Sequence, residues 1–194
     1  MIEQAAASMA KACQRMSLAS LQTIFTTKPA RELFMEFYVI GFAVVLTVII
    51  NVVKCDSQIW ALLVSYRIID IVSYRVYYLL LKSKQQPWTE ATCRRSLLIA
   101  FLNVYELVIA FGALYIYSGQ VMHGNVTLAD PLSATYFSAV TLMTVGYGDY
   151  TPMGQGAQLL VCTQLLSGMV MLTFIIPALI SLLGIGGNRS RAGL

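Results

Sequence analysis

Charged residues are scarce in this sequence: Asp, Glu, Lys and Arg together make up 11% of its 194 residues. A soluble globular domain carries about 25%, whereas 58% of this chain is hydrophobic. The composition therefore excludes an ordinary soluble domain and predicts a membrane protein, of a length that suits one compact domain. The net charge is +4. In a membrane protein such an excess of Lys and Arg usually marks the cytoplasmic segments, and it does not indicate a nucleic-acid partner.

The residue types that usually carry catalysis are also sparse. The chain has one histidine, His123, and its four cysteines (Cys13, Cys55, Cys93 and Cys162) lie far apart, with no Cys-x-x-Cys spacing. We interpret the cysteines as small apolar residues rather than disulfide partners or metal ligands. Because no nucleophile–base pair and no metal cluster stand out, we expect neither an enzyme nor a cofactor.

Long apolar runs are what the sequence does have. Four segments reach the roughly 20 mostly apolar residues that a membrane-spanning helix needs: residues 34–53, 59–81, 97–118 and 156–183. Residues 1–33 precede them as an N-terminal arm, for which an interfacial helix and a solvent-exposed helix are both open. Residues 184–194 form a short tail.

Lysine and arginine are distributed unevenly between the connecting segments. They occur in the N-terminal arm, in the loop of residues 82–96 and in the tail, but residues 119–155 contain none. The positive-inside rule therefore places both termini and the 82–96 loop in the cytoplasm, and residues 119–155 outside. This predicts a multi-pass protein of the cell membrane.

The outer stretch 119–155 contains a second, shorter apolar segment. Asp130 and Pro131 together predict a helix start, with Asp as N-cap and Pro in the first turn. Residues 131–143 are apolar but too short to span, so we expect a short helix that enters the membrane and returns. The Gly-rich run 144–149 follows without a helix or strand period.

A non-helical backbone at membrane depth is tolerated only where it is buried in protein or lines a water-filled path. Gly146 and Gly148 adopt positive φ at little cost, and a backbone of alternating handedness aims successive carbonyls the same way. A stack of such carbonyls replaces the water shell of a dehydrated cation. Because one strand cannot encircle an ion, we expect a homotetramer with four-fold symmetry.

Residues 144–149, Thr-Val-Gly-Tyr-Gly-Asp, resemble the selectivity filter of potassium channels residue for residue. Residues 150–152, Tyr-Thr-Pro, are similar to the continuation found in the voltage-gated branch, and Tyr136 and Phe137 match the aromatic pair of the pore helix. The resemblance covers about residues 97–183. Residues 1–96 resemble no family that we can name.

The resemblance implies roles for individual residues. It implies that K⁺ is bound by the Thr144 hydroxyl and by four backbone carbonyls, those of Thr144, Val145, Gly146 and Tyr147. It also implies that the filter is supported by Gly148, Asp149, Tyr136 and Phe137. Val140 stands where some family members have an acid that bonds the aspartate, so we expect that brace to be absent, with Tyr136 or Phe137 packing around the filter instead.

Two residues of the last apolar segment match positions associated with gating in the family. Gly168 lies where a hinge glycine often stands, and Pro177 where voltage-gated members carry the second proline of Pro-x-Pro, with Ile175 in place of the first. For Gly168, a hinge and close helix packing are both open. Pro177 bends a helix because it lacks an N–H and clashes with the preceding turn; its role as a gate is a hypothesis.

The second apolar segment carries Arg67, Asp70 and Arg75. A lone charge near the bilayer centre costs roughly 2.5–3.5 kcal/mol, so Arg67 and Asp70, three residues apart, are expected to pair. Glu106 is a further candidate partner for either arginine. Two arginines with an acid between them make a poor voltage sensor, and we favour a structural ion pair.

Two residues of the outer loop have both a simple and a functional interpretation. His123 is expected to be a solvated loop histidine, with tuning of conduction by external pH as the alternative. Asn125 begins an Asn-Val-Thr glycosylation sequence that matters only in a eukaryotic source.

Taken together, these features predict an all-α membrane protein with four transmembrane helices, a re-entrant pore helix and a selectivity-filter loop in a four-fold symmetric tetramer. Residues 34–96 would form two peripheral helices with their cytoplasmic loop, and residues 97–183 the pore module. The expected function is passive, potassium-selective conduction, with K⁺, membrane lipids and three further copies as partners. The alternatives are a modulatory subunit that conducts only beside another chain, and a membrane scaffold with a vestigial pore.

Overall fold

The computed structural model describes residues 28–52, 58–77 and 90–191, which are mostly helical. The helices are α2 (Lys28–Val52), α3 (Gln58–Tyr77), α4 (Glu90–Ser118), α5 (Pro131–Leu142) and α6 (Gln155–Arg191). The strands are β1 (Val121–His123), β2 (Val126–Thr127) and β3 (Thr151–Pro152). Most of the N-terminal arm and most of the 82–96 loop, on which the orientation partly depends, lie outside the described residues.

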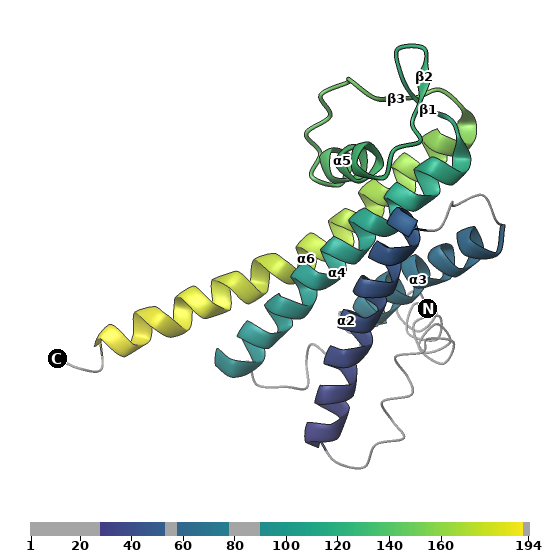
Figure 1. The fold of residues 1–194 in the computed structure, drawn as a ribbon. Coiled ribbons are helices and arrows are strands. Elements are labelled where there is room, and N and C mark those ends of the chain that lie inside the picture. Colours follow the sequence, from purple (N-terminus) through teal and green to yellow (C-terminus); the bar gives the residue numbers. More distant parts are fainter. Residues whose placement is uncertain (1–27, 53–57, 78–89, 192–194) are drawn as a thin grey trace, which may run out of the picture.

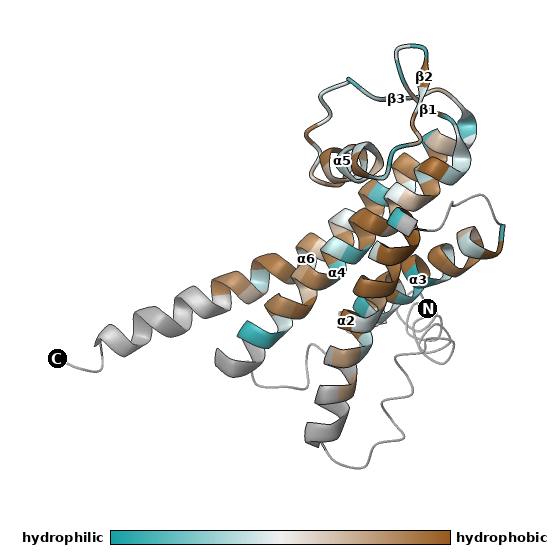
Figure 2. Cartoon of the chain, viewed as in Figure 1, coloured by the Kyte–Doolittle hydropathy of each residue, from teal (hydrophilic) through white to brown (hydrophobic). Residues whose placement is uncertain are grey.

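Two of the described helices contain segments long and apolar enough to cross a membrane, Arg94–Ser118 in α4 and Gln155–Ile180 in α6. Within the described residues, Phe37–Asn51 of α2 is apolar but shorter, and α3 contains no such segment. Figure 2 shows apolar residues along much of α2, α4 and α6, and polar residues around the strands. The third and fourth expected spans are thus confirmed as candidates by length and composition, while the first two stay predictions.

Helix α4 lies at the centre of the molecule and packs against α6, α2 and α3, and α3 also contacts α6 (Figure 1). Its middle is buried: Leu107, Phe111 and Tyr115 are at most 1% exposed. Gly112 allows α5 to approach, because a Cβ at this position would lie 3.3 Å from the backbone oxygen of Ala134. Small residues of this kind permit close helix contacts where van der Waals packing is the main attraction.

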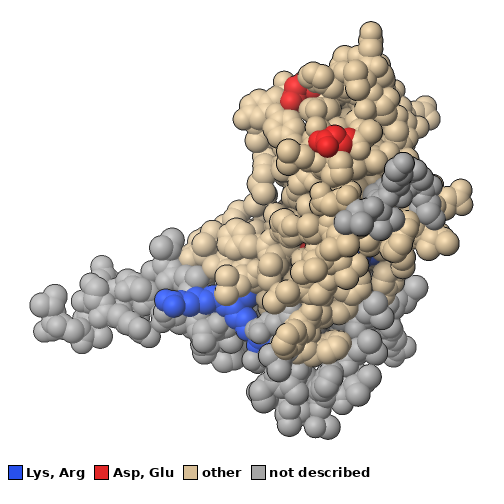
Figure 3. Space-filling view, in the orientation of Figure 1, with Lys and Arg blue, Asp and Glu red and all other residues tan. Residues whose placement is uncertain are grey.

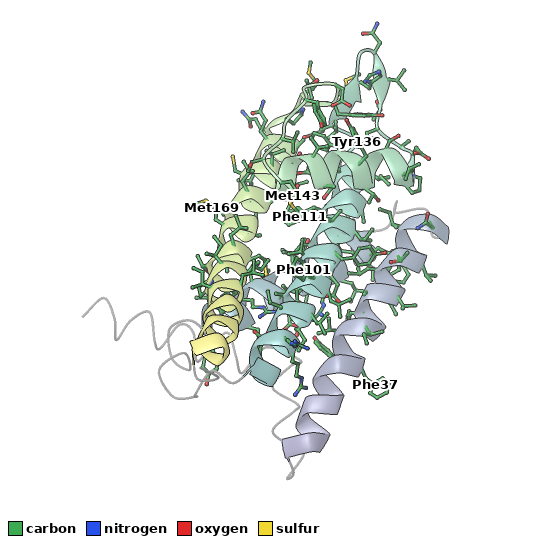
Figure 4. The ribbon with its side chains drawn as sticks, turned by 90° about the vertical axis from the view of Figure 1, so that its left-hand side faces the viewer. Phe37, Phe101, Phe111, Tyr136, Met143 and Met169 are labelled. Carbon is green, nitrogen blue, oxygen red and sulfur yellow. The ribbon has the colours of Figure 1, made fainter. Side chains whose placement is uncertain are left out.

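The outward face of α2 is strongly apolar. Phe37 is 68% exposed and points away from the other helices in Figure 4. Val44, Val45 and Val48 are also exposed on this helix. Such a face suits contact with lipid chains rather than water.

Helix α5 begins where its sequence predicts. Asp130 has an extended backbone, and its carboxylate accepts a hydrogen bond from the Ser133 N–H, while Pro131 occupies the first turn. The helix ends at Leu142, one residue before the expected end. It lies across the end of the α4–α6 pair (Figure 1).

Three short strands form an element that the all-α expectation does not include. Their order is β2-β1-β3, and both pairings are antiparallel. Met122 of β1 is opposite Thr127 on one side and Thr151 on the other. The sheet therefore joins the segment before α5 to the segment that follows the filter-like loop.

The two long helices extend beyond their expected bounds. α4 begins at Glu90 rather than at residue 97, and α6 runs from Gln155 to Arg191, including most of the expected tail. Pro177 lies inside α6 without ending the helix.

Charged side chains separate along the molecule in the view of Figure 3. Acidic surface lies at the end that contains the strands and α5, and basic surface lies toward the opposite end. This separation agrees with the sequence, in which residues 119–155 contain no lysine or arginine.

Candidate functional site: a Gly-rich loop held between α5 and the strands

The loop that follows α5 has a backbone of alternating handedness. Thr144, Gly146 and Gly148 have φ of +57°, +60° and +80°, whereas Val145 and Tyr147 between them are not in the positive-φ region. Glycine adopts such a φ freely, but for threonine it costs roughly 1–2 kcal/mol. A strained residue persists only where the surrounding structure holds it in place.

The first residues of the loop are attached to the last turn of α5. The N–H of Thr144 donates to the Thr141 carbonyl at 3.0 Å, and that of Val145 to the Val140 carbonyl at 2.9 Å. The Thr144 hydroxyl donates to the Met143 carbonyl at 2.7 Å. The position of α5 therefore fixes where the loop begins.

The far end of the loop is attached to the sheet. His123 Nδ1 lies 2.7 Å from the Asp149 carbonyl oxygen, an acceptor, so this nitrogen carries the proton and donates. The His123 ring also lies 5.0 Å from the ring of Tyr150. His123 is thus exposed but bonded to the loop, rather than being a freely solvated histidine.

An aromatic cluster lies between α5 and the segment after the loop. The rings of Tyr136 and Phe137 lie 6.1 and 6.2 Å from that of Tyr150, and Phe137 packs edge-on against Tyr115 at 4.8 Å. Tyr136 is labelled on α5 in Figure 4. The two aromatic residues matched to the pore helix therefore pack against the loop's outer end.

Asp149 has a bonding partner on α5, at one of the two aromatic positions expected to pack around the filter. A hydrogen bond to its carboxylate raises the pKa of the Tyr136 phenol above its ordinary value. Val140 has no polar side chain, so the aspartate lacks a partner at that position. Position 140 thus offers no acid to bond the aspartate, and Tyr136 contacts it from α5 instead.

A fully buried polar network joins α4, α5 and α6 behind the loop. The Tyr115 hydroxyl donates to Gln164 Oε1 at 2.6 Å, and Gln164 Nε2 donates to both the carbonyl and the hydroxyl of Ser138, at 2.8 and 2.7 Å. None of the three residues has measurable exposure. Sequence reasoning missed this network, although a glutamine in the middle of an apolar segment was a signal for it.

Gly168 lies one helical turn after Gln164 and faces the end of α5. A Cβ at Gly168 would lie 3.1 Å from Leu142 Cδ1 and 3.4 Å from the Leu142 oxygen. Of the two open interpretations of Gly168, this contact favours close packing over a hinge.

Three of the four charges expected in the membrane, Arg67, Asp70 and Glu106, meet in one buried cluster. Arg67 forms ion pairs with Asp70 and Glu106, each at 2.7 Å. The Tyr38 hydroxyl donates to Asp70 at 2.7 Å, and the Arg67 guanidinium lies 4.6 Å from the Tyr38 ring centre. Each charge therefore has an opposite charge beside it, which lowers the cost of placing them among apolar residues.

Arg75, further along α3, contacts α6. Its guanidinium lies 5.4 Å from the ring centre of Phe174 on α6. The Asn103 amide, with its oxygen turned toward the guanidinium, accepts from Arg75 Nη2 at 2.9 Å. Arg75 is buried, whereas an arginine that reaches for the membrane interface would extend its guanidinium to the surface.

The loop is open on one side in the single chain. Val145 and Tyr147 are 50% and 71% exposed. Within the described residues, no group of His, Cys, Asp and Glu side chains suits a metal ion. The oxygens that this loop offers include its backbone carbonyls, the Thr144 hydroxyl and the Asp149 carboxylate.

Comparison with known proteins finds similarity to channels over the segment that contains the loop. The family model described as "Ion channel" matches residues 104–184, which include α5, the loop and most of α6. Residues 104–184 therefore resemble ion channels, in agreement with the resemblance noted in the sequence.

Two relatives are potassium channels by name. The Voltage-gated potassium channel Kch of Escherichia coli (strain K12) is 29% identical over 96 residues, 48% of this chain and 21% of that protein. The Two-pore potassium channel 1 of Arabidopsis thaliana is 40% identical over 73 residues, 38% of this chain and 19% of that protein. The chain thus spans about a fifth of each relative's length. No solved structure matches it.

Proposed function

We propose that this chain is the subunit of a potassium-selective channel, in which four copies surround a passive pore lined by the 144–149 loop. The observation that carries the proposal is the alternation of positive φ at Thr144, Gly146 and Gly148 within the Thr-Val-Gly-Tyr-Gly sequence. Such a backbone presents successive carbonyls to one side, where they replace the water around K⁺. Thr144, Val145, Gly146 and Tyr147 would bind the ion.

The exposure of the loop supports four-fold assembly. One chain supplies one wall of carbonyls, and a desolvated cation needs ligands on every side. Leu166, Met169 and Leu172 leave a large apolar surface on α6, which neighbouring copies would cover. A closed ring of identical subunits meets both needs.

We also propose that α2 and α3 span the membrane outside the pore. Their 25 and 20 residues correspond to about 37 and 30 Å at 1.5 Å per residue, enough to cross a hydrocarbon core of about 30 Å. Arg67 of α3 forms ion pairs with Glu106 on α4 and with Asp70. With the strands and α5 outside, the acidic end of the molecule faces outward and both termini are cytoplasmic.

The proposal is tested by reconstituting the purified chain alone in liposomes loaded with KCl or, in parallel, with NaCl. We expect fast K⁺ efflux, detected as proton influx by a pH-sensitive dye in the presence of a protonophore, and far slower Na⁺ efflux. We also expect a mass in detergent that corresponds to four chains. A tetramer that passes no ion on its own would instead indicate a modulatory subunit or a scaffold. Equal K⁺ and Na⁺ fluxes would contradict selectivity.

A further inference from the structure

Two contacts between α5 and α6 follow one another along both helices, one turn apart. Ser138 and Leu142 lie one turn apart on α5, and Gln164 and Gly168 lie one turn apart on α6. Ser138 is bonded to Gln164, and Leu142 abuts Gly168. Residues four apart lie on the same helix face, so a single face of α6 meets a single face of α5.

The first of these contacts, between Gln164 and Ser138, depends on the orientation of the Gln164 amide. The Gln164 amide uses its oxygen for the Tyr115 hydroxyl and its nitrogen for two oxygens of Ser138. The Tyr115 bond thereby orients the amide so that its N–H groups face α5. Because the three residues are fully buried, no water can replace a lost partner, and an unpaired group there is costly.

The second contact, between Leu142 and Gly168, lies at the end of α5 from which the loop begins. Leu142 is the last residue of α5, and Thr144 and Val145 are bonded to carbonyls of the same helix at positions 141 and 140. A change in the depth of α5 relative to α6 would therefore move the start of the loop. The strained φ of Thr144 makes that start sensitive to small displacements.

We propose that Gln164 is a positioning residue for ion selectivity: by holding Ser138 it sets the height of α5 and so the spacing of the carbonyls at Thr144 and Val145. Gln164 does not itself touch the ion. This inference rests on the proposed function, since it concerns the selectivity of the same loop. It assigns to a glutamine of the inner helix a role in discrimination between K⁺ and Na⁺.

The test compares permeability ratios of tetramers in planar bilayers under K⁺ on one side and Na⁺ on the other. Gln164→Met keeps the side-chain size but removes both bonding groups. Loss of these buried bonds changes an equilibrium on the order of tenfold, so we expect the Na⁺/K⁺ permeability ratio to rise by about that factor. Gln158→Met, at an exposed position of the same helix, is the matched control and should leave the ratio unchanged.

Two smaller changes separate positioning from mere stability. Ser138→Ala removes one of the two acceptors for Gln164 Nε2, and Tyr115→Phe removes only the bond that orients the amide. We expect both to shift the ratio in the same direction as Gln164→Met, but less. If Gln164→Met does not assemble, the permeability ratios of these two variants test whether Gln164 positions the loop.

The outcomes are distinguishable. A wild-type chain that fails to select K⁺ overturns the proposed function. A selective wild-type chain, together with an assembled Gln164→Met tetramer of unchanged permeability ratio, overturns the role of Gln164 alone. If Gln164→Met does not assemble, unchanged ratios in both Ser138→Ala and Tyr115→Phe overturn it as well.

Discussion

Arg67 of α3 and Glu106 of α4 form an ion pair of 2.7 Å, with side-chain exposures of 3% and 0%. Asp70 binds the same guanidinium from within α3. This cluster connects a peripheral helix to the outer helix of the proposed pore. It lies among apolar residues, where breaking a charge pair leaves an uncompensated charge.

Removing the central cation of this cluster should destabilise the protein strongly. Arg67→Met removes the cation that Asp70 and Glu106 share in a buried position, and losing one member of such a pair costs about 3–5 kcal/mol. We expect a clear fall in the thermal unfolding midpoint in detergent. Arg94→Met, at an exposed position of α4, is the control and should cost less than about 1 kcal/mol. Equal stability of the two variants would contradict the structural role of the cluster.

Gly168 should behave as a packing glycine. Gly168→Ala places a Cβ 3.1 Å from Leu142 Cδ1. We therefore expect lower thermal stability and a change in the size of the K⁺ current. The added change Leu142→Val, which removes one methylene from the crowded side chain, should restore much of both. A hinge role predicts no restoration, because a smaller Leu142 would not return backbone freedom to position 168.

Replacing Gly146 should abolish K⁺ conduction without preventing assembly. A Cβ at Gly146 meets no atom within 4 Å, but alanine at φ of +60° costs about 1–2 kcal/mol. In Gly146→Ala we expect the backbone to relax and the carbonyl stack to be lost. Gly41→Ala, also in open space but in a helix, is the matched control. Normal K⁺ flux in Gly146→Ala tetramers would be inconsistent with carbonyl binding at this loop.

The bond between Tyr136 and Asp149 should make the outer loop sensitive to alkaline pH. A hydrogen bond to Asp149 raises the pKa of Tyr136, so its stabilising effect is fully present below the unfolded tyrosine pKa of about 10. It is lost as the pH rises through the still higher pKa of the folded state. We expect Tyr136→Phe to shorten channel openings at neutral pH.

The pH profile provides the check on that bond. As the external pH increases above about 10, the open times of the wild-type channel should approach those of Tyr136→Phe, which should change little. Open times that differ by the same factor at all pH values would show that the bond is not responsible.

Some of the site could be predicted from local sequence because the governing interactions are local. Asp130 and Pro131 start α5 through bonds within one helical turn, and the glycines at 146 and 148 permit positive φ wherever they occur. The ion pair of Arg67 with Asp70 is likewise a contact within one helix. These features depend on neighbours that the sequence itself displays.

Other parts could not be predicted, because they join distant residues or lack a pattern. Gln164 meets Ser138, 26 residues earlier, and His123 meets Asp149, 26 residues later; neither spacing has a periodic signature. The strands are two or three residues long, too short for alternation to appear. Whether α2 and α3 span the membrane also depends on their charge partners, not on hydropathy alone.

The reversal potential of the purified chain tests the central claim most directly. Tetramers in a planar bilayer would be recorded with KCl on one side and an equal concentration of NaCl on the other. A filter of backbone carbonyls at Thr144, Val145, Gly146 and Tyr147 predicts a reversal potential displaced far from zero, in the direction set by K⁺ permeation. A reversal potential at zero would show that Na⁺ and K⁺ pass equally and would contradict the account.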